Sequence, residues 1–110
     1  RKLCMQFMFK VVLVLLFSFQ TAQASLSKGL DAAQAGDFMS AYELWLPMAK
    51  QGDAGAQFNV GLLHSKQLIP QASQEQSVKW YLLAANNDHV NAQFNLDIKY
   101  DNGLGVESLE

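Results

Sequence analysis

Cysteine, histidine and proline are scarce in this chain. Its 110 residues include one cysteine, Cys4, two histidines, His64 and His89, and two prolines. A single cysteine forms no disulfide within the chain, and His64 has no cysteine or carboxylate beside it at metal-ligand spacing. No segment alternates between apolar and polar residues as a half-buried strand does. The sequence therefore indicates neither a disulfide-stapled domain, nor a metal site, nor a strand-based fold.

Basic residues are also few once the N-terminal segment is set aside. Arg1, Lys2 and Lys10 lie in the first ten residues, which leaves five lysines against ten acidic residues and a net charge of −5 for residues 25–110. A surface of this sign repels nucleic acid and anionic lipid. We therefore expect no nucleic-acid partner, and no membrane contact after removal of the N-terminal segment.

The N-terminal segment has the three parts of an export signal. A positive flank precedes an apolar run, Val11–Phe19, and the small-x-small pattern Ala22-Gln23-Ala24 follows. A run of nine residues, Val11–Phe19, is too short to cross a bilayer, which takes about 20. We predict a signal peptide over residues 1–24, cleaved after Ala24, and a periplasmic or secreted protein. Retention of the segment as an anchor is the alternative. Cleavage would also remove Cys4, and with it any thiol chemistry.

Residues 25–110 contain an internal repeat. The segment Ala49–Val60 aligns with Ala85–Leu96 at an offset of 36, with five of twelve positions identical, including the run Ala-Gln-Phe-Asn. A fixed period of this length is typical of stacked structural units. We predict one repeat domain over residues 25–110, with a leading helix at about 26–35 and units at about 37–72 and 73–106.

The apolar residues within each unit recur at helical spacing. Phe38, Ala41, Tyr42, Trp45 and Ala49 step by three and four, as do the apolar positions after Ala54 and after Val78. Asp37 is placed to cap a helix that starts at Phe38, and Ser73 to Gln76 has the spacing of a capping box. The pattern predicts an all-α protein with helices of about 9 to 14 residues joined by short turns. Trp45 and Phe58 fall on stripes of facing helices, and Pro47 is expected to bend or open its helix.

Several motifs occur in the order found in a known family. They are Gly36-Asp37-Phe38, the segments 45–49, 52–61 and 79–85, and 92–96 with Tyr100, Gly103, Gly105 and Val106. This series resembles Sel-1-like repeats, relatives of the tetratricopeptide repeat, over about residues 30–106. The resemblance implies a short α/α solenoid, a right-handed superhelix of antiparallel helix pairs, that acts as an adaptor or scaffold, often in the bacterial envelope.

The sequence departs from that family at a few positions. Such repeats usually carry glycine where this chain has Asp97, and a glycine pair where Gln67 and Ile69 stand. An aspartate at a helix crossing would bury a charge unless it is paired or faces water. Either the last helix is partly exposed, or the chain is a drifting or truncated copy.

Few residues suggest chemistry. Gln57, Asn59, Gln93 and Asn95 recur at the repeat period, and we predict that they line a concave surface that contacts a protein or peptide partner. Hydrogen bonding between helices is the alternative for these four residues. No nucleophile, base and orienting group come together in the sequence, so we expect no catalysis, no cofactor and no metal.

The remaining polar and aromatic candidates have structural interpretations. We expect His64 to be a half-buried packing residue, His89 to lie solvated in a turn, and Asp53 and Asp88 to start helices. The aromatic residues Tyr42, Trp45, Trp80 and Tyr81 are predicted to be core rather than a ligand cage. Two alternatives to a binding module stay open, an exported hydrolase-like repeat protein and a truncated fragment without function. The apolar C-terminal helix also predicts weak self-association.

Overall fold

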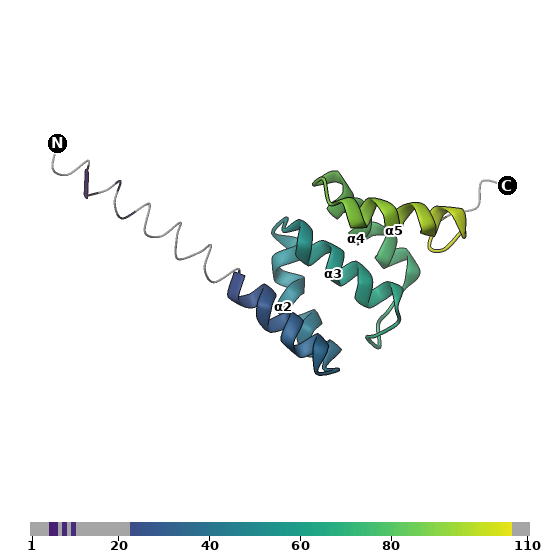
Figure 1. Ribbon diagram of the computed structural model, residues 1–110, viewed down its shortest axis with the longest axis horizontal. Coiled ribbons are helices and arrows are strands. Elements are labelled where there is room, and N and C mark those ends of the chain that lie inside the picture. Colours follow the sequence, from purple (N-terminus) through teal and green to yellow (C-terminus); the bar gives the residue numbers. More distant parts are fainter. Residues whose placement is uncertain (1–4, 7, 9, 11–22, 107–110) are drawn as a thin grey trace.

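The computed structural model describes residues 5, 6, 8, 10 and 23–106 (Figure 1). In this part of the chain all regular structure is helical, which confirms the all-α prediction. A helical stretch over residues 23–34 is followed by α2 (Phe38–Lys50), α3 (Ala54–Ser65), α4 (Gln74–Asn86) and α5 (Val90–Asp101), packed in sequence as antiparallel pairs. None of the described helices combines the length and the apolar character needed to cross a membrane. The predicted signal peptide, residues 1–24, lies largely outside the described residues, which include only positions 5, 6, 8, 10, 23 and 24 of it.

Helix α2 begins where the sequence predicted. The Asp37 carboxylate accepts hydrogen bonds from the Ser40 backbone N–H at 3.2 Å and from the Ser40 hydroxyl at 2.7 Å. These bonds stabilise the charged form and hold the pKa of Asp37 below its usual range. The helix continues through Pro47 to Lys50, so the proline does not end it.

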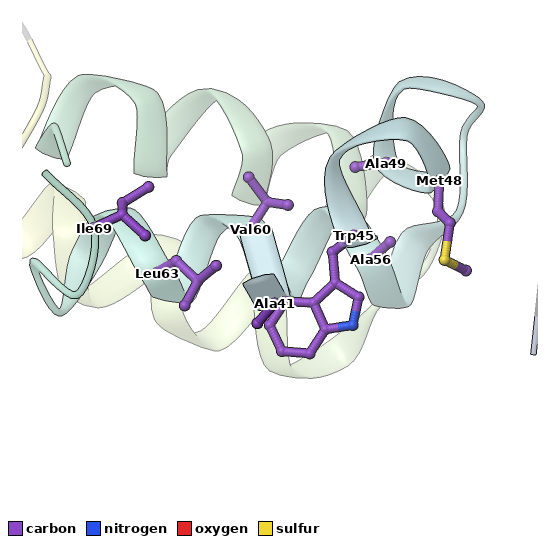
Figure 2. Packing of buried hydrophobic residues seen from close by; sticks show 8 residues of the cluster. All are labelled: Ala41, Trp45, Met48, Ala49, Ala56, Val60, Leu63 and Ile69. Atoms are coloured by element: carbon purple, nitrogen blue, oxygen red, sulfur yellow. The ribbon is translucent and has the colours of Figure 1, made fainter. Parts of the chain in front are cut away.

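The leading helical stretch, residues 23–34, covers one side of α2. The Trp45 indole N–H donates to the Leu26 carbonyl at 3.1 Å. Gly29 lies so close to the Trp45 ring that a Cβ there would clash with it. The ring belongs to a first core cluster that joins α2, α3 and the following turn (Figure 2), made up of Ala41, Trp45, Met48, Ala49, Ala56, Val60, Leu63 and Ile69.

Helices α3 and α4 approach each other closely at Gly61. A Cβ at Gly61 would lie 2.6 Å from the Tyr81 ring, so only glycine leaves room for it. The Ser77 hydroxyl donates to the Gly61 carbonyl at 3.0 Å. Tyr81 is 1% exposed and belongs to a second core cluster of α4 and α5, which also contains Val78, Ala84, Ala92 and Leu96.

The helix bounds recur along the chain. Helix α4 begins and ends 36 residues after α2, and α5 begins and ends 36 residues after α3. The caps recur at the same offset, since Asp37 and Ser73 cap α2 and α4 while Asp53 and His89 cap α3 and α5. The backbone geometry recurs at the same offset, since Gln67 and Gly103, 36 residues apart, both have a positive φ.

Two sequence predictions at the helix starts were wrong. Asp88 does not start α5, because it lies one residue before the N-cap and has a φ of 63°. His89 is that N-cap, and its Nδ1 accepts from the Ala92 N–H at 3.2 Å. Its ring also stacks on Phe58 with centroids 4.5 Å apart, so His89 is not a freely solvated turn residue. Asp53 caps α3 as predicted, since it accepts from the Ala56 N–H at 2.8 Å.

Candidate functional site

The two glutamines among the predicted partner-binding residues are hydrogen-bonded within helix pairs. Gln57 is buried, and its Nε2 donates to the Ala49 carbonyl at 3.1 Å. Its Oε1 accepts from the Asn87 side chain at 3.3 Å. Gln93 makes the same bond as Gln57 at an offset of 36 residues, because its Nε2 donates to the Ala85 carbonyl at 3.3 Å. Both glutamines therefore have the alternative role, that of linking consecutive helices, although Gln93 is also exposed.

The two asparagines lie differently. Asn59 on α3 and Asn95 on α5 are both half-buried. Asn95 lines a pocket, which is defined below, and Asn59 does not. Of the four predicted residues, Asn95 alone lines this pocket, and it does so together with residues that the sequence did not single out.

This pocket has a volume of about 300 Å³ and is formed by α3, α4, α5 and the turn after α5. Its apolar lining consists of Leu62, Ile98 and Leu104. Its uncharged polar lining consists of Ser65, Gln74, Tyr81 and Asn95. Two lysines, Lys66 and Lys99, complete it, and we call it the Lys99 pocket.

Lys99 is the least expected residue of this pocket. It is 5% exposed, although it carries an ammonium group. Its Nζ donates to Gln74 Oε1, and Gln74 is held in turn because its Nε2 donates to the Ser65 carbonyl at 3.1 Å. Burial lowers the pKa of Lys99, because the charged form loses hydration. The amide of Gln74 thus positions a desolvated cation at the pocket.

The charge of the pocket is opposite to that of the chain. The chain has a formal net charge of −2 with ten acidic residues, yet no aspartate or glutamate lines the pocket. Lys66, the exposed C-cap of α3, adds a second ammonium beside Lys99. A pocket with two cations and no carboxylate attracts anions.

The alignment at an offset of 36 residues could have indicated that Lys99 is unusual. At the offset of 36, Lys99 corresponds to Leu63, which is 3% exposed in the first core cluster. A lysine at a position where the other unit has a buried leucine is costly unless it has a partner or a function. Lys99 was not among the predicted site residues, because those predictions rested on recurring amides, histidines, carboxylates and aromatic residues.

A second surface with a functional character is the outer side of α5, which we call the α5 stripe. Val90, Phe94 and Ile98 are 73%, 65% and 43% exposed. The residues 36 positions earlier, on α3, are half-buried, and two of them, Phe58 and Leu62, pack against the second core cluster. Asp97 lies on the same side and is exposed, whereas its counterpart Gly61 packs on Tyr81. The last helix is therefore partly exposed, as one of the two sequence interpretations had it.

His64 and the four aromatic candidates make structural contacts. His64 is 3% exposed, more buried than predicted, and its Nδ1 accepts from the Ser73 N–H at 3.2 Å. Its ring also meets Tyr42 edge to face, with centroids 6.1 Å apart. Trp45 and Tyr81 lie in the core, and Trp80 and Tyr42 pack against the first core cluster.

Within the described residues, no three histidine, cysteine or acidic side chains come close enough to hold a metal ion. Comparisons with protein-family models, with curated proteins and with solved structures found no match for this chain.

Proposed function

We propose that this chain is an exported helical-repeat protein that binds a protein or peptide partner as an adaptor or scaffold, without catalysis. The observation that carries the proposal is the α5 stripe. Val90, Phe94 and Ile98 expose apolar surface that the equivalent helix, α3, keeps half-buried. Contiguous exposed apolar surface on a small protein marks a place where another molecule docks.

The finer architecture is part of the proposal. We infer that α2 with α3, and α4 with α5, are two copies of one Sel-1-like unit in a short right-handed solenoid. The recurrence of helix bounds, N-caps and the glutamine-to-carbonyl bonds at an offset of 36 residues supports this. A solenoid of helix pairs offers extended surfaces to partners, and Asn59 and Asn95 remain candidates to contact one.

Export rests on the sequence pattern of residues 1–24 and leads to a periplasmic or secreted location. Mass spectrometry of the exported protein tests this part of the proposal, because cleavage after Ala24 gives a mature chain that begins at Ser25. Recovery of the uncleaved chain in a membrane fraction would show that the segment is an anchor instead.

Partner binding is tested by affinity capture from envelope extract with three forms of the purified protein. We expect a partner captured by the wild type to be lost with Phe94→Asp, because this substitution places a charge in the α5 stripe. Leu30→Asp is the matched control, since Leu30 is 51% exposed on the leading helical stretch, away from α5. Equal capture by all three forms would contradict the proposed surface. Hydrolysis of model ester, amide and glycoside substrates by the purified protein would contradict the absence of catalysis.

A further inference from the structure

The Lys99 pocket contains a buried cation without a counter-charge. The ammonium of Lys99 donates to a neutral amide oxygen, that of Gln74, and no carboxylate lines the pocket. Removing an ammonium from water is unfavourable unless an opposite charge compensates it. Gln74 compensates only in part, because an amide dipole carries no net charge. An anion that enters the pocket would supply the counter-charge that the lining residues lack.

The polar lining is suited to an oxygen anion. Lys66 supplies three further donors, and Ser65, Tyr81 and Asn95 each carry a side-chain donor. Charge-assisted hydrogen bonds of this kind are about twice as strong as neutral ones. Four donor-bearing side chains around Lys99 are enough to saturate the lone pairs of a carboxylate.

The apolar lining points to the rest of the ligand. Leu62, Ile98 and Leu104 supply the apolar part of the pocket lining, and Ile98 belongs to the α5 stripe as well. A ligand that places a charged oxygen at Lys99 therefore has apolar surface available beside it. An apolar group that carries an acid matches both parts, whereas a purely polar anion would leave the apolar lining in contact with water.

The charge of the chain limits how many negative charges the ligand carries. Of the two pocket lysines only Lys99 is buried, and its charge is balanced by one negative charge, whereas water already solvates the exposed Lys66. The formal net charge of −2 repels ligands with several negative charges. A monocarboxylate fits this balance better than a phosphate, which carries between one and two charges at neutral pH.

The geometry points to a carboxylate-binding site in the Lys99 pocket, where Lys99 anchors the carboxylate of an apolar peptide segment of the partner. This inference deepens the proposed function and rests on it. The carboxylate comes either from the C-terminus of the segment or from an aspartate or glutamate within it, and the two sources share the same chemistry.

The test is a titration of the full chain with small ligands, in which binding is measured by ¹H–¹⁵N chemical shifts and by calorimetry. The first probes are N-acetyl-leucine and its amide, which differ in the carboxylate. We expect the acid to shift the amide signals of Asn95, Ile98 and Lys99 and to bind at least about tenfold more tightly than the amide. Equal binding of the two would overturn the inference, and so would tighter binding of inorganic phosphate.

The source of the carboxylate is separated by two apolar hexapeptides. One has a free C-terminus and no acidic side chain, and the other has an amidated C-terminus and one internal glutamate. The peptide that binds more tightly identifies the source. If neither peptide binds while N-acetyl-leucine does, the carboxylate site stands and the protein-partner proposal fails. If both bind no better than a peptide without any acid, partner binding stands and the carboxylate site fails.

Lys99→Leu is the decisive variant, because leucine is what the first unit has at the equivalent position, Leu63. The chain is expected to fold with an unchanged or higher Tm, since the substitution removes a buried charge. Carboxylate binding should fall at least about tenfold. Lys50→Leu is the matched control, since Lys50 is exposed at the end of α2 and does not line the Lys99 pocket. Binding to Lys99→Leu at wild-type strength would contradict the inference.

Discussion

His64 is the residue whose protonation bears most directly on the fold. Its Nδ1 accepts the Ser73 N–H, and burial lowers the pKa of the ring from the ordinary value of 6.5. Protonation would turn this acceptor into a donor and would place a charge in a buried site. The first turn of α4 therefore depends on a neutral imidazole.

We expect the free energy of unfolding to fall as the pH is lowered through about 6.5. The unfolded chain takes up a proton at His64 near this pH, while the folded chain takes it up only at lower pH, so the loss continues down to the pKa of the folded state. Urea unfolding at about pH 7.5 and pH 5 measures it. Asp37 does not interfere, because its pKa lies below 3.8. A His64→Gln variant that keeps the same slope would assign the effect to another group.

The cost of truncating Trp45 should exceed that of truncating Phe58. Trp45 is 4% exposed and fills the space against Gly29, so Trp45→Ala is expected to lower the free energy of unfolding by about 3 to 5 kcal/mol. Phe58 is half-buried, with its ring against His89 and Tyr81, so Phe58→Ala should cost about 2 kcal/mol. Chemical denaturation of both variants gives the comparison. Equal losses of stability in the two variants would contradict the half-buried position of Phe58.

Gln67 adopts a backbone conformation that suits glycine. Its φ is 56°, and its counterpart Gly103 has a φ of 65°. Gln67→Gly should therefore stabilise the fold by about 0.5 to 1 kcal/mol, because the left-handed region is costly for residues with a Cβ. Gln51→Gly is the matched control, since Gln51 caps α2 with a φ of −83° and should lose stability on the same change. A thermal melt of the two variants decides it, and a destabilised Gln67→Gly would contradict the expectation.

At the scale of helices, the sequence predicted most of the fold because local signals are strong there. The starts of α2 and α4 follow from the short polar side chains of Asp37 and Ser73, which bond to backbone N–H groups three residues on. The start of α5 escaped prediction because His89 is a rare N-cap and Asp88 beside it is a common one. Only the backbone geometry separates the two.

The candidate site was less predictable, because its geometry depends on packing between helices. The glutamines recur in the sequence, yet Gln57 becomes buried between helix ends and bonds to Ala49 and Asn87. Lys99 differs from its counterpart Leu63 in the alignment. Its proposed role in binding becomes visible only in the pocket that α3, α4 and α5 form. Periodicity shows which residues share a role in the stack, but not which of them face a partner.

Helix α5 should be the least protected of the four helices from α2 to α5. On its outer side Val90, Phe94 and Ile98 are 73%, 65% and 43% exposed. We expect hydrogen exchange to show fast amides from Asn91 onward and protected ones over residues 38–64. Protection of α5 that rises with protein concentration would indicate self-association through this helix. A monomer at all concentrations with even protection up to Tyr100 would contradict the prediction.

At the scale of the molecule, the two sides of the helix stack differ. Residues 23–34 pack against α2 through Leu26, Gly29 and Ala32 and turn mainly polar residues to water. The side formed by α5 is open over the described residues. The stack therefore has one closed side and one open side.

This difference decides what kind of assembly the protein can enter. A filament needs two complementary faces on every subunit, so that each subunit adds to the one before it. In the described part of the chain, residues 23–34 cover α2, so a subunit that docks through α5 does not offer the α2 side as a second apolar face. We therefore expect complexes that form through the α5 stripe to be finite rather than filamentous.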